Sequence, residues 1–177
     1  MRNQSLKNKI LKQTPHATIK LKDNIVYKFY NQGFPLHITK EWEKDYNDLR
    51  NINSHFIKIL EYNRTENYIS MPYVQVQTIT EKFFIKQNLY QTLQLIKDMM
   101  MFAEERNGFI HTDLHGDNLL MNVNNRDIVV IDPDSFLYKK SNIYTEFWKY
   151  RAKYEFDNSI RRLMQYWFHR KNNIYST

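Results

Sequence analysis

The chain of 177 residues contains no cysteine, only three glycines and only four prolines. The absence of cysteine excludes disulfide bonds and zinc sites with thiolate ligands. The sequence also lacks an apolar run of membrane-spanning length, and residues 1–7 lack the apolar core of a signal peptide. No repeat or low-complexity stretch divides the chain, and 42% of its residues are hydrophobic. We therefore expect one globular domain with a real hydrophobic core.

Acidic residues are fewer than basic ones, since the chain has 19 aspartates and glutamates and 26 lysines and arginines, which gives a net charge of +7. Such a charge favours acidic partners over cationic ones. Basic residues gather at 139–140, 161–162 and 169–171, where they are candidates for contact with an acidic protein, a phosphorylated glycolipid or nucleic acid. Clusters of this kind are more often solvated surface, and that alternative stays open.

The most informative segment is residues 111–118, His-Thr-Asp-Leu-His-Gly-Asp-Asn, followed by the apolar run 128–131 and Asp132. Asp113 and Asn118 lie five residues apart, and Asp132 begins a turn after a hydrophobic strand. Side chains of these types position a hydroxyl group and bind Mg²⁺ on a nucleoside triphosphate. The alternative is a polar loop between a helix and a strand. The joint spacing favours a phosphoryl-transfer site.

This arrangement resembles the protein-kinase-like superfamily, and the loop is most similar to that of its aminoglycoside and lipopolysaccharide kinase branch. The apolar residues between 89 and 102 recur at helical spacing, as in the long helix that precedes the family's catalytic loop. The resemblance implies that Asp113 deprotonates or orients the acceptor hydroxyl and that Asn118 and Asp132 bind Mg²⁺. It also implies that His111 is buried behind the loop.

The implied fold class is α+β, a bilobal protein-kinase-like fold. Residues 1–74 would form a small β-rich N-lobe with one helix, and residues 75–177 a truncated helical C-lobe that carries the catalytic loop. Together the two lobes would make one domain. In the tail, Asp157 is a natural cap for a helix over 157–168 and would brace the catalytic loop.

A β-prone run, residues 25–30, follows the turn-forming pair Asp23-Asn24 and places Lys28 within a strand. A strand lysine is often a solvated edge residue. In the resemblance, however, this strand is similar to the family's Val-Ala-Ile-Lys strand, whose lysine holds the α- and β-phosphates of ATP. Lys28 is therefore a candidate for catalysis and for nucleotide binding.

The family's strand lysine is held by an acid on the next helix, which the sequence predicts over residues 40–52. The positions of the apolar residues that follow favour Asp45 as the ion-pair partner of Lys28. Glu41 and Glu43 remain alternatives, and all three acids can also be ordinary surface charges.

The region that binds adenine is expected at residues 68–74, which resemble the strand and hinge between the two lobes. Met71 would be the gatekeeper, the Pro72 carbonyl would accept from the adenine amino group, and the Val74 N–H would donate to the ring. Proline is tolerated there because only its carbonyl is needed. The resemblance also assigns Leu120 to the nucleotide-binding set.

Two departures from the family pattern stand out. Residues 12–18 contain no glycine where a glycine-rich turn should cover the phosphates, so we expect weak ATP binding, with Gln13 or Thr14 replacing amide contacts. The sequence Asp132-Pro-Asp134 also lacks the usual Phe and Gly. Asp134 is either an additional metal ligand or, as we favour, a turn residue.

The resemblance implies an ATP- and Mg²⁺-dependent phosphotransferase. We expect a minimal Ser/Thr protein kinase whose acceptor is an acidic protein. Alternatives are a kinase of an anionic glycan such as lipopolysaccharide or of a small molecule, a nucleotidyl transferase, and a catalytically dead kinase-like binding protein. The charge of +7 disfavours aminoglycosides, which are polycations, while nucleic acid stays open as a partner.

The expected location is the cytoplasm, where ATP is present. Heavy use of Asn, Lys, Ile and Tyr indicates an AT-rich genome, such as that of a phage, a small bacterium or an intracellular parasite. For an effector, the host cytoplasm is expected.

Overall fold

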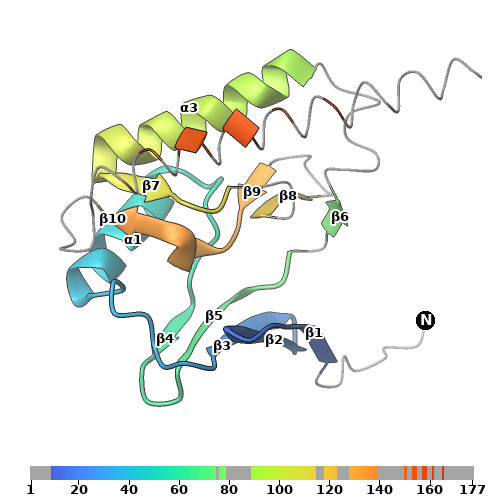
Figure 1. Cartoon of the computed structure of the whole chain (residues 1–177), viewed down its shortest axis with the longest axis vertical. Helices are drawn as coiled ribbons and strands as arrows, with labels where there is room; N and C mark the ends of the chain where they lie inside the picture. Colours follow the sequence, from blue (N-terminus) through green and yellow to red (C-terminus); the bar gives the residue numbers. More distant parts are fainter. Residues whose placement is uncertain are drawn as a thin grey trace, which may run out of the picture.

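The computed structural model describes residues 9–74, 76–78, 89–114, 118–122 and 128–138, together with residues 150, 153, 154, 157, 158, 161 and 165. In Figure 1 the helix α3 lies at the top and the strands β1, β2 and β3 lie at the bottom, with α1 and β10 between them.

The N-terminal part is a five-stranded antiparallel sheet in the order β1-β2-β3-β5-β4. Its strands are β1 (Lys9–Gln13), β2 (Ala17–Lys22), β3 (Ile25–Tyr30), β4 (Glu61–Asn63) and β5 (Tyr68–Pro72). Asp23 and Asn24 join β2 to β3 with φ angles of 50° and 62°, the backbone that a two-residue hairpin turn requires. The expected strand over 25–30 is confirmed, and it lies at the centre of the sheet.

The helix α1 (Lys40–Ile52) has the bounds that the sequence predicts. The hydroxyl of Thr39 caps it by accepting from the N–H of Trp42 at 3.1 Å. Trp42, Tyr46 and Leu49 form one fully buried face of this helix. The Trp42 indole donates to the carbonyl of Phe136 at 3.1 Å, which ties α1 to a strand more than ninety residues away in sequence.

The remaining elements come later in the chain. They are β6 (Val76–Thr78), α3 (Leu89–Asn107), β7 (Phe109–His111), β8 (Leu119–Asn122), β9 (Ile128–Val130), the 3₁₀ helix η2 (Pro133–Ser135) and β10 (Phe136–Tyr138). Strands β7 and β10 pair antiparallel, and β6, β8 and β9 form a three-stranded sheet in that order. Gly108, at φ 72°, ends α3 and turns the chain into β7.

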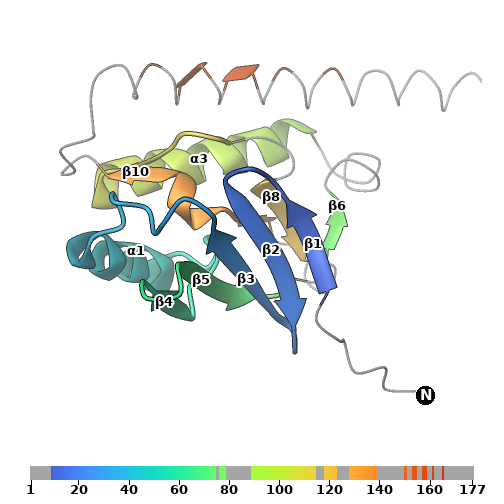
Figure 2. The ribbon, with the colours of Figure 1, turned by 60° about the horizontal axis from the view of Figure 1, so that its bottom comes forward.

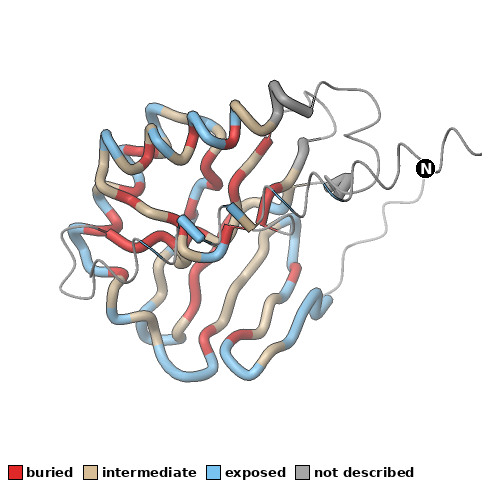
Figure 3. Tube along the Cα trace, turned by 45° about the horizontal axis from the view of Figure 1, so that its top comes forward, coloured by how far each residue is buried: buried red, intermediate tan, exposed pale blue. Residues whose placement is uncertain are grey.

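One hydrophobic core joins the two parts. Phe56 forms a parallel bridge with Val130 of β9, and the Ile57 N–H donates to the Val130 carbonyl at 3.0 Å. The rings of Trp42 and Phe109, of Phe56 and Phe136, and of Phe109 and Phe136 pack edge to face, and the Tyr46 ring packs at a tilt on Phe136. The buried positions run through the interior between the helices and the sheets (Figure 3). This core fixes the position of β9 relative to β3.

Candidate active site

Lys28 meets two aspartates from the opposite part of the chain. Its ammonium forms an ion pair with Asp132 and a second with Asp134, whose oxygens lie 2.8 and 2.9 Å from Nζ. The lysine side chain is 13% exposed, and the two aspartates are 21% and 12% exposed. The structure thus brings together Lys28 and Asp132, which the sequence separates by 104 positions.

The charges of this cluster are strongly coupled. Burial by itself lowers the pKa of Lys28, but the carboxylates of Asp134 and Asp132 outweigh it and raise this pKa. Burial opposes ionisation of Asp132, yet the Lys28 ammonium holds the pKa of Asp132 below its ordinary value. For Asp134, burial and the neighbouring carboxylate raise the pKa against the effect of Lys28. Two carboxylates share one ammonium, so the cluster has the charge to attract a further cation.

The turn that carries both aspartates is held tightly. Asp132 has φ 64° and ψ 56°, a left-handed conformation that is uncommon for a non-glycine residue. The Ser135 hydroxyl donates to Asp132 at 2.6 Å, and His37 lies 2.8 Å from the carbonyl of Asp134 through its Nε2. Pro133 begins η2 with its ring-fixed φ. Backbone strain supported in this way is typical of functional turns.

The expected ion pair between Lys28 and Asp45 is wrong. The Asp45 carboxylate accepts from the hydroxyl of Tyr138 on β10, and its side of α1 therefore faces β10 and not β3. The rival Glu43 pairs with Arg64 and, at 3.1 Å, with Lys40. In the structure the acids that hold Lys28 come from the turn after β9.

Asp134 is the residue whose importance the sequence reasoning missed. Its signal was the acid in the place of the family's glycine, two positions after Asp132. A turn residue needs only a short polar side chain, whereas a buried carboxylate needs a cation. Asp134 is both part of η2 and an ion-pair partner of Lys28.

The loop after β7 places the other candidate residues. Asp113 is exposed, and its carbonyl accepts from the side-chain amide of Asn118 at 2.7 Å. Asn118 is buried, and its carbonyl accepts from the Ile131 N–H at 2.9 Å. This bond connects the loop to the residue just before Asp132.

His111 is buried, as expected, with Nε2 3.3 Å from the Ile131 carbonyl. Residues 115–117 lie outside the described residues.

The expected adenine site lies at the end of β5. Met71 is buried and pairs with Val26, while Pro72 and Val74 are partly buried. The Tyr73 N–H donates to the Asn24 carbonyl at 2.8 Å and holds this segment against the β2–β3 turn. Leu120 lies on β8 and is partly buried.

The β1–β2 turn lies within residues 12–18, the segment for which Gln13 and Thr14 were predicted to contact phosphate. The Thr14 hydroxyl donates to the Ala17 carbonyl at 3.1 Å and accepts from the Ala17 N–H at 3.0 Å. Thr14 therefore closes its own turn. Gln13 is exposed at the end of β1 and is the better candidate of the two for a phosphate contact.

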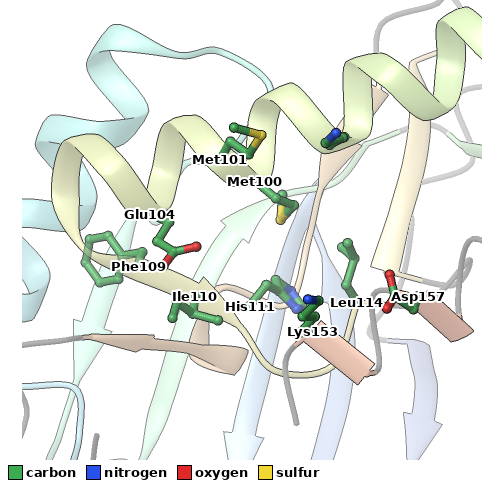
Figure 4. A pocket seen from close by; sticks show the side chains of 10 residues that line it. Met100, Met101, Glu104, Phe109, Ile110, His111, Leu114, Lys153 and Asp157 are labelled. Atoms are coloured by element: carbon green, nitrogen blue, oxygen red, sulfur yellow. The ribbon is translucent and has the colours of Figure 1, made fainter. Parts of the chain in front are cut away.

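A cavity of about 340 Å³ lies behind the loop, between α3, β7 and the C-terminal residues. Figure 4 shows Asp157 beside Leu114, with Lys153, His111 and Met100 around the same cavity. Asp157 is exposed, and its role as a brace of the catalytic loop stays a prediction.

Of the expected helix over 157–168, the residues that the structure describes are helical. The basic clusters 139–140 and 169–171 lie outside the described residues.

The donors in this region fit Mg²⁺ chemically. Within the described ranges no group of three or more His, Asp or Glu residues is arranged to hold a metal ion by itself. Mg²⁺ on a nucleotide needs only one or two protein oxygens besides phosphate and water. A carboxylate at Asp132 and an amide oxygen at Asn118 satisfy that need, and the surplus negative charge beside Lys28 favours a cation.

No protein-family model matches the sequence, and no curated protein matches it. The maize SIRK1 (sucrose-induced receptor kinase 1) kinase domain bound to AMP-PNP is similar in structure, with a TM-score of 0.50, 15% identity, and coverage of 77% of this chain and 56% of that domain. The Cydia pomonella granulovirus kinase PK-1 has a TM-score of 0.46 and 20% identity, with coverage of 72% and 51%. The chain thus spans about half the length of these kinases.

The chain has a small protein-kinase-like fold, in which a β-rich sheet and α1 lie against a second part with α3. The expected α+β kinase-like fold class is confirmed. None of the helices in the described ranges combines the length and the apolarity needed to cross a bilayer.

Proposed function

We propose that this protein is an ATP-dependent kinase that transfers the γ-phosphoryl group to a hydroxyl acceptor. The observation that carries the proposal is the meeting of Lys28 on β3 with Asp132 after β9, within a kinase-like fold. Asn118 connects this pair to the loop that carries Asp113. A cation for phosphate, oxygens for Mg²⁺ and a carboxylate for the acceptor are the groups that phosphoryl transfer requires.

Each residue has a separate task in this proposal. Lys28 binds the α- and β-phosphates, and Asp132 with Asn118 binds Mg²⁺. Met71 lines the adenine site, whose polar contacts come from the Pro72 carbonyl and the Val74 N–H. Leu120 on β8 completes the nucleotide-binding set.

In the chemical step, the acceptor oxygen forms a bond to the γ-phosphorus while the bond from that phosphorus to the β–γ bridging oxygen breaks. The acceptor proton passes to Asp113, and ADP leaves. Mg²⁺, when bound, neutralises charge on the β- and γ-phosphates. Asp113 suits its task because it is exposed, whereas Asn118 and His111 behind it are buried and fix the loop.

Asp134 takes the place of the helix acid that normally orients the lysine. Asp132 would hold Mg²⁺ when the ion is bound, and Asp134, a buried carboxylate 2.8 Å from Nζ, would continue to orient Lys28. Asp45 is engaged with Tyr138 and is not needed for this task.

Asp134→Asn is expected to weaken the affinity for Mg²⁺·ATP at least about tenfold, because a charge-assisted hydrogen bond is worth about 1.5–3 kcal/mol. Titration with a fluorescent ATP analogue measures this change. Asp45→Asn, which keeps an acceptor for Tyr138, is the matched control and should change the affinity less than about twofold. Asp134→Glu restores the charge and should recover part of the affinity. If Asp45→Asn lost affinity for Mg²⁺·ATP and Asp134→Asn did not, Asp45 on α1 would be the acid that orients Lys28.

We propose an acidic protein as the acceptor, with an anionic glycan as the second candidate. The net charge of +7 supports an anionic acceptor. Dephosphorylated casein, lipopolysaccharide and the basic histone H1 serve as three test acceptors. Casein should be labelled fastest and the histone slowest.

The proposed function is tested with ATP labelled at the γ- or the α-phosphate, each with Mg²⁺ or with EDTA. Phosphoryl transfer labels the acceptor from γ-labelled ATP alone and only with Mg²⁺. Label from α-labelled ATP would instead establish nucleotidyl transfer. Absence of label from both, with ATP bound, would establish a binding protein on a kinase-like scaffold.

A further inference from the structure

The outer face of the N-terminal sheet carries three aromatic rings. Tyr27 and Phe29 alternate with Lys28 along β3, so they lie on the face opposite to the candidate active site. Tyr68 of β5 lies directly across from Phe29 in the register of the sheet. The ring centres are 5.5 Å apart for Tyr27 and Tyr68, 5.1 Å for Phe29 and Tyr68, and 6.3 Å for Tyr27 and Phe29. The three rings form one continuous group, here called the aromatic platform.

Lysines from β1 and β2 lie on one side of the aromatic platform. The Lys20 ammonium lies 4.7 Å from the centre of the Phe29 ring, in cation–π geometry. Lys9 and Lys22 line the same shallow hollow, whose volume is about 570 Å³. All three lysines are exposed. Among the residues that line the hollow, Glu66 is the one acid.

This face is open in the part of the chain that the structure describes. Figure 2 shows β1, β2 and β3 at the front, with α3 above them and α1 to their left. Tyr27 and Phe29 are half-buried, so part of each ring is open to solvent. The hydroxyl of Tyr68 donates to Glu61 at 2.7 Å, and this hydrogen bond raises the pKa of Tyr68 and anchors one edge of the platform. Tyr68 itself is only 8% exposed, so Tyr27 and Phe29 provide the part of the platform that is open to solvent. Apolar rings that are open on a surface are a common sign of a binding site.

We propose that the aromatic platform binds single-stranded nucleic acid. Unpaired bases stack on aromatic side chains, and lysines beside the rings contact the phosphates. Tyr27 and Phe29 provide the stacking surface, while Lys20 and Lys22 provide the cations. An acidic peptide would use the lysines but would leave the rings without a partner. A duplex keeps its bases paired and stacked, so it cannot use the rings either.

The site is independent of the proposed phosphotransfer. Lys28 points to the other face of the same strand, so changes to Tyr27 and Phe29 remove no side chain of the candidate active site. An experiment can therefore refute nucleic-acid binding while kinase activity is present, and it can also refute kinase activity while nucleic-acid binding is present.

The test is fluorescence anisotropy of the full chain with a fluorescein-labelled 15-nucleotide oligo(dT) and the matching oligo(U). These two arms distinguish DNA from RNA, and a hairpin duplex of equal charge is the control ligand. Single strands should bind at least about tenfold more tightly than the duplex. Polyglutamate added as competitor should displace the oligonucleotide poorly, because it cannot stack. Equal binding of single strand and duplex, or efficient displacement by polyglutamate, would show simple ion exchange and overturn the proposal.

Variants separate stacking from charge. Phe29→Leu keeps an apolar side chain in the sheet and should weaken single-strand binding about tenfold through lost stacking. The Lys20→Gln/Lys22→Gln double variant should lower the slope of log K against log salt by about 1.4, since each phosphate contact contributes about 0.7 on single strands. Lys44→Gln on α1, at a lysine that is 74% exposed, and Tyr154→Ala, at a tyrosine that is 64% exposed, should leave both quantities unchanged.

Thermal unfolding of each variant establishes that it is folded. Undiminished binding by folded Phe29→Leu and by folded Tyr27→Leu would exclude the platform as the site.

Discussion

The Asp113→Asn variant is expected to bind Mg²⁺·ATP as the unchanged protein does, and to transfer the phosphoryl group at least about 100-fold more slowly. The reason is that Asp113 touches the acceptor and not the nucleotide in our account. Asparagine keeps the size of the side chain and a hydrogen-bonding oxygen, but it cannot take a proton. Steady-state rates with γ-labelled ATP, together with a nucleotide titration, measure the two quantities separately.

The control for this experiment is Asp48→Asn on α1, at an exposed aspartate far from the loop in sequence. It should leave both the turnover and the affinity as they are. Turnover by Asp113→Asn at the rate of the control would remove Asp113 from the mechanism. The assignment of a kinase-like fold would stand after that result, because it rests on the arrangement of the helices and sheets and not on Asp113.

Lys28→Met is expected to abolish detectable transfer and to weaken nucleotide binding strongly. No glycine-rich turn supplies amide groups for the phosphates, so Lys28 carries a large share of the phosphate contacts. The change also leaves Asp132 and Asp134 facing each other without a cation. Breaking a buried ion pair in this way costs about 3–5 kcal/mol of folding stability. Urea unfolding, measured together with the activity, shows how much of the loss is due to unfolding.

Lys28→Arg keeps the positive charge and therefore separates the two effects. The pair with the aspartates should persist and the protein should stay folded, while transfer is still impaired because the guanidinium group presents its donors in a different geometry. Lys58→Met, at an exposed lysine, is the matched surface control. Tight nucleotide binding by folded Lys28→Met would mean that the cation for the phosphates lies elsewhere.

The pH dependence of the Lys28 cluster follows from the same charges. The raised pKa of Lys28 keeps it an ammonium throughout the neutral range. The lowered pKa of Asp132 stabilises the folded protein above the ordinary pKa of a carboxyl group, and this contribution disappears as the pH falls through the lowered value. The raised pKa of Asp134 acts in the opposite direction, because its proton is bound more tightly in the folded state.

Local sequence patterns were sufficient to predict the strand and the helices that carry the candidate site residues. The Asp23-Asn24 turn and the β-prone residues after it set β3, and the apolar periodicity set α1 and α3. These patterns depend on backbone preference and on one buried face, both of which are local. The position of Lys28 within a strand followed from them, whereas the burial of His111 was implied by the resemblance to the protein-kinase-like superfamily.

The ion-pair partner of Lys28 could not be predicted from the local sequence. Which side of α1 faces β3 depends on how Trp42 and Tyr46 pack against Phe109 and Phe136, residues that come more than sixty positions later. That packing brings Asp45 to Tyr138. Asp134 reaches Lys28 because the core fixes the turn after β9 relative to β3, a long-range consequence that no local pattern in either segment reveals.

The most direct test of the central claim is calorimetric titration of AMP-PNP into the wild-type protein and into Asp132→Asn, each with Mg²⁺ or with EDTA. Our account predicts that the wild type binds AMP-PNP with Mg²⁺ and loses most of this affinity in EDTA. It also predicts that Asp132→Asn shows little further dependence on Mg²⁺, because the carboxylate that holds the ion is gone. Equal affinity in all four titrations, or no binding at millimolar AMP-PNP, would contradict a Mg²⁺-nucleotide site at Lys28 and Asp132.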